Sequence, residues 1–345
     1  MMTDITAIHA PVLLQDCVDL VAPALQHEGA IVVDCTLGLA GHATAFLKAA
    51  PFATLVGIDR DTEALALATE RMRNEGLDNR FIPAHAAFDE IDEVLREHNI
   101  DSIDAAFMDL GLSSLQIDEA DRGFSYSHDT ALDMRMDTTQ SVTAATILAT
   151  YDVHELTKIF REYGEERFSA PIARRIVEIR DTQPIATSGQ LVSLVDSVIP
   201  KAHRATGNPA KRVFQALRIE VNGELDKLSR TLPKIVLNLH EHGRLVVESY
   251  HSLEDTTVKR FMNQGLTVDV PANMPVIPDD AQPFFKPLTR GAMKASKEEV
   301  EHNTRSSSVR LRAVELCRPV PKRWLPRLKD EAYGFVNSKG GRLHG

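Results

Sequence analysis

The chain has 345 residues, of which 43% are hydrophobic and 26% are charged, so two structural units with buried cores are expected and wholesale disorder is excluded. Its formal net charge of −10 argues against a protein that coats nucleic acid through bulk positive charge. No apolar run approaches the roughly 20 residues that cross a bilayer, which excludes a membrane span.

The first ten residues include Asp4 and lack the basic and then apolar order of a secretory signal, so we expect a cytoplasmic protein. The three cysteines, Cys17, Cys35 and Cys317, are odd in number and form no CxxC pair. Their spacing indicates packing roles, and the sequence predicts no metal site.

The first third of the chain alternates short apolar runs with helical patterns, which is typical of a parallel sheet covered on both faces. The predicted strands are residues 30–36, 53–58, 80–85 and 103–110, and the predicted helices are residues 42–50 and 62–75.

The alternation stops after Gly111, and helical patterns follow at residues 153–163, 170–181 and 188–198. It resumes with a helix over 209–238, a strand over 243–250, a helix over 253–264 and a last strand over 307–316. Residues 265–303, with five prolines between Pro271 and Pro287, are predicted to form a long loop. We therefore expect an α/β domain in two parts, residues 1–115 and 212–345, around an inserted helical domain at residues 116–211.

Residues 34–42 run from the first buried strand into a helix and contain Gly38 and Gly41. Small residues at such a turn let backbone N–H groups approach a ligand closely, although tight packing alone also explains two glycines. Asp59 ends the second strand 18 positions after Gly41, where a carboxylate accepts the protons of a ribose diol. The pair indicates a nucleoside cofactor, either a nicotinamide dinucleotide or S-adenosylmethionine.

Asp109 ends the fourth strand, so we expect it in the same crevice as Gly41 and Asp59. The groups that follow, Ser113, Ser114 and Gln116, add hydrogen-bonding capacity there; the alternative is a turn in which the serines cap a helix.

Phe88 follows the third strand and is suited either to stacking on an adenine ring or to the core. His251 and Ser252 end the fifth strand, at the same edge of the sheet as Asp109, and Ser252 is predicted to cap the next helix together with Asp255.

Helical spacing groups Lys211, Gln215, Arg218 and Asn222 on one polar face, which suits contacts with phosphates and bases, although an ordinary amphipathic helix has the same pattern. Residues 286–345 carry 14 Lys and Arg against 6 Asp and Glu. This basic C-terminal tail is either a local basic surface or a solvated segment.

Motifs spread over nearly the whole chain resemble, in the same order, those of the bacterial 16S ribosomal RNA cytosine-N4 methyltransferase family, also known as the RsmH or MraW family. The matching segments are residues 9–14, 41–42, 109–116, 122–125, 132–137, 163–168, 212–222, 251–255 and 305–307. So many motifs in order make the resemblance highly specific.

The resemblance implies a Rossmann-like class I S-adenosylmethionine-dependent methyltransferase fold with an inserted helical domain. It implies methylation of a specific cytidine in the decoding region of 16S rRNA, on naked RNA or in the small ribosomal subunit. It places the cofactor on Ala40, Gly41, His42, Asp59, Phe88, Asp109 and Gln116.

The chain departs from the family pattern at several positions. Leu37, Leu39 and Ala40 stand where Phe, Arg and Gly are usual, Leu115 replaces a proline, and Tyr250 stands where phenylalanine is common. We expect Leu39 to alter substrate or cofactor contacts at the turn, whereas Tyr250 should matter little.

Cytosine N4 is a poor nucleophile, because its lone pair is delocalised into the ring, so the site must orient the amine and accept a proton. The chain lacks the Pro-Pro-aromatic signature that DNA amino-methyltransferases use for this task. We infer that Asp109 or His251 orients the amine, with Asp133 as a third candidate. We expect Lys211, Arg212, Arg218 and Asn222 to bind RNA.

Two other function classes remain open at this stage. A nicotinamide oxidoreductase would share Gly41 and Asp59 without needing a basic helix, and a non-catalytic ribosome-assembly factor would bind RNA without transferring a methyl group. The sequence leaves open whether the protein is a monomer or a homodimer.

Overall fold

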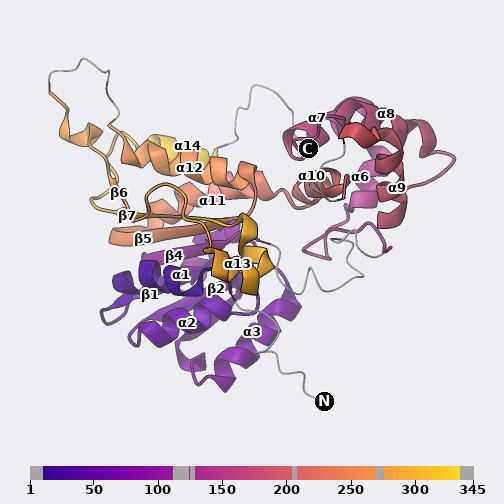
Figure 1. Ribbon diagram of the computed structural model, residues 1–345. Coiled ribbons are helices and arrows are strands. Elements are labelled where there is room, and N and C mark those ends of the chain that lie inside the picture. Colours follow the sequence, from indigo (N-terminus) through magenta and orange to yellow (C-terminus); the bar gives the residue numbers. More distant parts are fainter. Residues whose placement is uncertain are drawn as a thin grey trace. The chain divides into compact units, whose positions relative to one another are not determined.

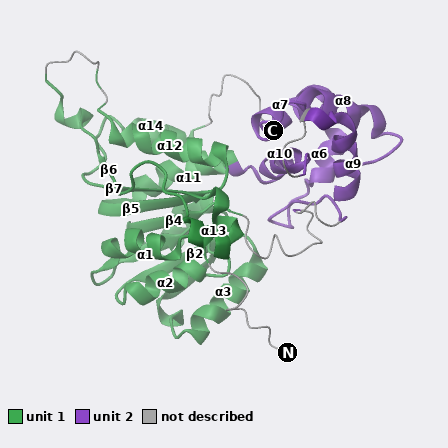
Figure 2. Ribbon diagram, viewed as in Figure 1, with its two compact units in different colours: residues 1–111, 225–345 green, residues 112–224 purple. Residues whose placement is uncertain are grey.

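The computed structural model describes residues 11–111, 124, 129–203, 208–268, 270 and 276–334 (Figure 1). The chain divides into a sheet unit, residues 1–111 with 225–345, and a helical unit, residues 112–224 (Figure 2). The insert therefore ends at Glu224 rather than at residue 211. The reason is that Val213, Phe214 and Leu217 are buried in the hydrophobic core of the helical unit.

Among its described residues, the sheet unit has seven strands in the order β3-β2-β1-β4-β5-β7-β6 (Figure 1). Strands β1 to β5 pair in parallel, as the alternating pattern predicted, whereas β7 pairs antiparallel with both β5 and β6. The strands are β1 (Ile31–Asp34), β2 (Thr54–Asp59), β3 (Phe81–His85), β4 (Ile103–Asp109), β5 (Leu239–Ser249), β6 (Phe285–Pro287) and β7 (Arg310–Leu316).

The direction of β7 follows from the connection that precedes it. β7 begins at Arg310, whose register partner is Ser249 at the carboxyl end of β5. The connection from β6, which contains the six-residue helix α13 (Lys297–His302), brings the chain to this end of the sheet, so the strand that begins there runs antiparallel to β5. No direction was predicted for this last strand. The predicted loop of residues 265–303 is wrong, since it contains β6 and α13.

Both faces of the sheet are buried. Successive residues of a strand point to opposite faces, so neighbouring residues lie in different cores. Val32 and Phe107 lie in one core with residues of α1, α2 and α3, and Val33 and Met108 lie in another with residues of α4, α11, α12 and α14. Burial on both faces explains the continuous apolar runs of these strands. The helices are α1 (Leu14–Val21), α2 (Gly41–Ala49), α3 (Thr62–Asn74), α4 (Ile91–Glu97), α11 (Glu224–Asn238), α12 (Ser252–Leu266) and α14 (Leu325–Tyr333).

The helical unit has its own hydrophobic core, which includes Phe160, Ile172 and Leu191. Asp152 and Thr187 begin α7 and α9 with reciprocal capping boxes, so short polar signals define these helix starts. The helices are α6 (Ala144–Thr150), α7 (Val153–Glu162), α8 (Ser169–Ile179), α9 (Ser188–Val198) and α10 (Lys211–Asn222).

The single helix predicted over residues 209–238 is two helices, α10 and α11. Gly223 ends α10 in the left-handed region, with φ of 60°, which favours glycine and stops a helix. Short 3₁₀ helices complete the described structure at Ala22–Leu25, Asp78–Arg80, Phe88–Glu90, Lys201–His203, Asp279–Ala281 and Thr304–Ser308. Within the described ranges, no helix is both long and apolar enough to span a membrane.

Candidate active site

Three aspartates end three neighbouring strands. Asp34 ends β1, Asp59 ends β2 and Asp109 ends β4, and β1 lies between the other two strands. The carboxyl ends of parallel strands meet at one edge of a sheet, and open sheets of this type bind ligands at that edge. The structure therefore brings Asp59 and Asp109 to the same edge and adds Asp34 to them.

The turn between β1 and α2 is held by backbone hydrogen bonds. Ala40 N donates to Leu37 O at 2.8 Å, and Gly38 N donates to Asp59 Oδ2 at 2.8 Å. A Cβ atom on Gly41 would lie 2.5 Å from Pro11 Cγ, so close packing excludes a larger residue. α2 begins there without a side-chain cap, which leaves the N–H groups of its first turn available to an anion.

Ala40 has φ of 57°, in the left-handed region that glycine adopts without steric cost. The resemblance noted in the sequence implies glycine at this position. The methyl group of Ala40 is fully buried, and its packing partly offsets the backbone strain.

We expect Ala40→Gly to raise the free energy of unfolding by about 1 kcal/mol or less, because relief of the left-handed strain exceeds the entropic cost of glycine. Urea unfolding of both proteins measures the change. Ala45→Gly, in the middle of α2, is the matched control and should lower stability by about 1 kcal/mol. A loss of stability in both variants would contradict the prediction.

Asp59 supports the turn in addition to ending β2. Its Oδ2 accepts Gly38 N at 2.8 Å, and its Oδ1 accepts Asp61 N at 2.9 Å. Burial nevertheless raises the pKa of Asp59 above its usual value. The carboxylate has remaining lone pairs, and ligand hydroxyl groups can donate to them.

Asp34 was not singled out from the sequence, although it lies in the motif of residues 34–42. Its side chain is buried and accepts Thr36 N at 3.1 Å. Burial, with the negative charges of Asp109 and Asp59 nearby, raises the pKa of Asp34 to about 7. An acidic residue at the end of an otherwise apolar strand is the signal that identifies it.

Asp109 is held in place by the residues around it. Its N–H donates to Thr36 Oγ1 at 2.6 Å, and its Oδ1 accepts Gly111 N at 3.2 Å. Burial, reinforced by the negative charge of Asp109 nearby, raises the pKa of Tyr250. Tyr250, noted only as a departure from the family pattern, therefore lies close to the candidate acceptor.

The side chain of His42 points into the core. Its Nε2 lies 2.8 Å from Val12 O and 3.7 Å from Glu248 Oε2, and its ring packs 4.6 Å from the ring of Phe107. Burial lowers the pKa of His42. At the start of α2, His42 therefore offers the cofactor its backbone N–H and not its imidazole.

Of the two remaining cofactor candidates, the structure describes Phe88 but not Gln116. Phe88 begins a 3₁₀ helix after β3 and is partly buried against one core of the sheet unit. Gln116 lies outside the described residues, as do Ser113 and Ser114.

His251 caps α12, and the prediction that Ser252 does so is wrong. Glu254 N donates to His251 Nδ1 at 3.4 Å, and Glu254 Oε2 accepts Tyr250 N at 2.8 Å and His251 N at 3.2 Å. The Nε2 of His251 lies 2.9 Å from Glu254 Oε1. The capping box is thus shifted by one residue, because imidazole, a rare cap, replaces the expected hydroxyl.

The family follows from comparison with known proteins. A model described as the MraW methylase family matches residues 6–317. The chain belongs to this family.

Relatives named Ribosomal RNA small subunit methyltransferase H are similar over their whole length. The protein of Bifidobacterium adolescentis is 67% identical over 342 residues, which cover 99% of this chain and 100% of the relative. That of Beutenbergia cavernae is 51% identical over 322 residues, which cover 93% and 96%. The resemblance found in the sequence is confirmed, and the chain is an S-adenosylmethionine-dependent methylase.

The donor groups of this methylase fit S-adenosylmethionine. That molecule carries a ribose diol, a carboxylate and two cationic groups. Carboxylates at the strand ends suit the diol and the cations, and the uncapped start of α2 suits the carboxylate. Burial raises the pKa values of Asp34 and Asp59, and a cationic ligand beside them favours their ionised forms.

The polar face predicted on α10 of the methylase is exposed only at its beginning. Lys211 and Arg212 are exposed, and Arg212 Nη1 donates to Glu165 O at 3.0 Å. Arg218 instead forms a two-bond ion pair with Glu224, at 2.9 and 2.8 Å. Its charge is therefore already paired.

The prediction that Asn222 lies on an RNA-binding surface is wrong, because its side chain is only 2% exposed. Asn222 Nδ2 donates to Met134 O at 2.8 Å, and its Oδ1 accepts Met136 N at 2.9 Å. Met134 has φ of 60°, so Asn222 holds a strained turn. Asp133 is engaged nearby in a bidentate pair with Arg135, which disfavours it as a proton acceptor.

Proposed function

We propose that this methylase transfers a methyl group from S-adenosylmethionine to N4 of a cytidine in the decoding region of 16S rRNA, in the cytoplasm. The proposal rests on full-length similarity to enzymes named for the small-subunit ribosomal RNA, together with Asp109 at the carboxyl end of β4. Naked 16S rRNA and the small subunit are the two candidate substrates.

The cofactor supplies an electrophilic methyl group on a sulfonium ion. Asp59 accepts hydrogen bonds from the ribose hydroxyl groups of the cofactor. The backbone N–H groups of Ala40, Gly41 and His42, at the start of α2, bind the carboxylate of the cofactor. Phe88 packs against the adenine, and Gln116 adds a polar contact. This assignment uses the strand ends and helix start that are characteristic of ligand sites in open α/β sheets.

Asp109 performs the task that the chemistry requires of the protein. Its carboxylate accepts a hydrogen bond from the N4 amine, which directs the nitrogen lone pair at the methyl group, and it receives a proton as the bond to carbon forms. The N–H of Gly111 keeps the carboxylate oriented, and Tyr250 lies close to it. His251 positions the β5–α12 turn next to it through the α12 cap.

The direct test supplies labelled S-adenosylmethionine to small subunits and to naked 16S rRNA that lack the modification, followed by nucleoside mass spectrometry. We expect labelled N4-methylcytidine. Label at cytosine C5 or at a ribose 2′-hydroxyl would overturn the reaction type. RNA binding without methyl transfer would favour an assembly factor, and reduction of a nicotinamide substrate would favour the oxidoreductase.

Cofactor binding should release protons in a pH-dependent manner. Because the pKa of Asp34 is about 7 in the free protein, this group is mostly protonated at about pH 6 and ionised at about pH 8.5. A cation bound beside it favours the ionised form, so release approaching one proton is expected at the lower pH and close to none at the higher pH.

Calorimetric titrations of S-adenosylmethionine in buffers of different ionisation enthalpy measure this release. Asp34→Asn should reduce it, with a smaller release remaining from Asp59, whose pKa burial also raises. A salt-bridged acid stabilises a protein more as the pH rises, and Asp34 does the opposite. Without cofactor, its contribution to the free energy of unfolding falls as the pH rises from about 4 to about 7. Release that does not change with pH would refute the assignment.

The exposed pair Lys211 and Arg212 is proposed to contact RNA phosphates. We expect replacement of both by Ala to weaken RNA binding and to lower its salt dependence by about one unit of slope for each phosphate that the variant no longer neutralises. Filter binding at several salt concentrations gives both quantities. Cofactor affinity should not change.

Lys259 and Arg260 on α12 are a matched control, because they are also an adjacent, exposed Lys-Arg pair. Their replacement should leave the salt slope nearly unchanged. Equal losses of RNA affinity and salt dependence for the two pairs would mean that RNA binds through general electrostatics, and not through the start of α10.

A further inference from the structure

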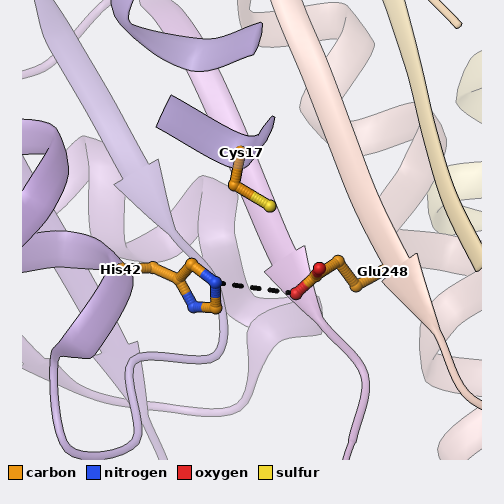
Figure 3. Close-up of side chains that lie close together, drawn as sticks. All are labelled: Cys17, His42 and Glu248. Carbon is orange, nitrogen blue, oxygen red and sulfur yellow. Dashed lines mark ion pairs between the residues drawn. The ribbon is translucent and has the colours of Figure 1, made fainter. Parts of the chain in front are cut away.

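Three side chains from separate elements meet in the core of the sheet unit: Cys17 of α1, His42 of α2 and Glu248 of β5 (Figure 3). Cys17 and Glu248 are 0% exposed and His42 is 6% exposed. One potential ligand atom from each lies within 4.8 Å of those of the other two. In Figure 3 the thiol, the imidazole and the carboxylate point toward a common centre.

Glu248 is the unusual member of this cluster. Within the described part of the chain, neither carboxylate oxygen accepts a hydrogen bond from a nitrogen or hydroxyl group, and His42 Nε2 is 3.7 Å away. The thiol of Cys17 beside it is only a weak donor. Leaving a buried carboxylate without a strong partner is costly.

The pKa values of both acidic groups of the free cluster are raised. Burial, with the charge of Asp109 nearby, raises the pKa of Glu248. Burial, with Glu248 beside it, raises the pKa of Cys17.

We propose that Cys17, His42 and Glu248 form a binding site for one zinc-like divalent cation. The ligands of this ion would be the thiolate, the carboxylate and the neutral imidazole, because metal ions bind the deprotonated forms of these groups. The charges of the thiolate, the carboxylate and the cation then sum to zero. The buried cluster remains neutral, and the carboxylate acquires a strong partner.

The donor set selects the class of ion. Thiolate and imidazole favour zinc and related transition ions over magnesium and calcium, which prefer oxygen donors only. His42 Nε2 now lies 2.8 Å from Val12 O. Coordination through Nε2 moves the ring proton to Nδ1 and frees the carbonyl of Val12, which offers an oxygen donor for a fourth position. A closed set of protein ligands is typical of a structural ion.

The site is distinct from the sequence signatures of zinc proteins. Its ligands are 25 and 206 residues apart in the chain, and no spacing motif joins them. The strand β5 and the helices α1 and α2 bring them together. The proposed methyl transfer requires none of these three side chains as an acceptor of the substrate proton.

The test uses the full-length protein without an affinity tag, reduced and stripped by chelation. Titration with Co²⁺ should produce a thiolate-to-metal charge-transfer band that saturates at one equivalent, and Zn²⁺ should abolish it by displacement. Zn²⁺ should also raise the thermal unfolding midpoint. Cys17→Ser and Glu248→Gln should each weaken Co²⁺ binding at least about 100-fold, a larger loss than is typical of outer-shell changes.

Cys35→Ser is the matched control, because Cys35 is equally buried but lies outside the cluster, and it should keep the band. Absence of a one-equivalent band in the unmodified protein would overturn the proposal, whatever the variants do. A band that persists in Cys17→Ser, or that disappears equally in folded Cys35→Ser, would also overturn it.

Discussion

Asp109→Asn is expected to slow methyl transfer by about 10²-fold or more in single-turnover reactions with saturating cofactor and RNA. The amide keeps the size of the carboxylate but cannot take the proton of the amine, and its NH₂ group presents donors where an acceptor is needed. Rapid quenching with labelled cofactor measures the rate. The affinities for cofactor and RNA should change much less than the rate.

Asp104→Asn is the matched control, since Asp104 lies in the same strand, β4, and its carboxylate accepts Ile31 N at 2.8 Å at the opposite end. It should affect stability and not the methyl-transfer step. A normal rate for Asp109→Asn with weakened cofactor binding would assign Asp109 to the cofactor alone.

His251 separates positioning from proton transfer. His251→Ala removes the α12 cap and should slow transfer by roughly 10²-fold, and His251→Asn, which retains an N-capping acceptor, should restore most of the rate. If Asn is as slow as Ala while both fold, the imidazole itself takes part in the chemistry.

The second large effect concerns Asp59. Asp59→Ala removes two charge-assisted hydrogen bonds to the ribose, each worth about 1.5 to 3 kcal/mol, so the affinity for S-adenosylmethionine should fall by about 10² to 10⁴-fold. Calorimetric titration measures it. The variant also loses the acceptor for Gly38 N and Asp61 N, and its stability should fall by about 1 to 3 kcal/mol.

Asp61→Ala distinguishes the two losses. Asp61 caps α3 by accepting Glu63 N and Ala64 N, so its replacement should cost about 1 kcal/mol of stability with little change in cofactor affinity. An unchanged affinity in folded Asp59→Ala would remove Asp59 from the site.

The α/β core could be predicted because its signals are local. Apolar runs such as residues 103–110 can be buried on both faces only as central strands, and small residues with carboxylates at their ends mark a ligand edge. The departures have equally specific causes. Gly223 divides a continuous helical pattern, and β7 runs antiparallel because it begins beside the carboxyl end of β5.

Site residues on helices were harder to assign. Periodicity places Lys211 and Asn222 on one face, but it contains no information about what packs against that face. Asn222 is buried under the Met134 turn, while Lys211 remains exposed.

The sequence by itself determined the fold class, the inserted helical domain, the family and the two carboxylates Asp59 and Asp109, since each depends on periodicity or on motifs within short segments. Only the tertiary structure decided that His42 turns its imidazole into the core, that His251 caps α12, and that Glu248 lies buried beside Cys17. Such contacts join residues up to hundreds of positions apart, and their energies depend on burial, which no local pattern encodes.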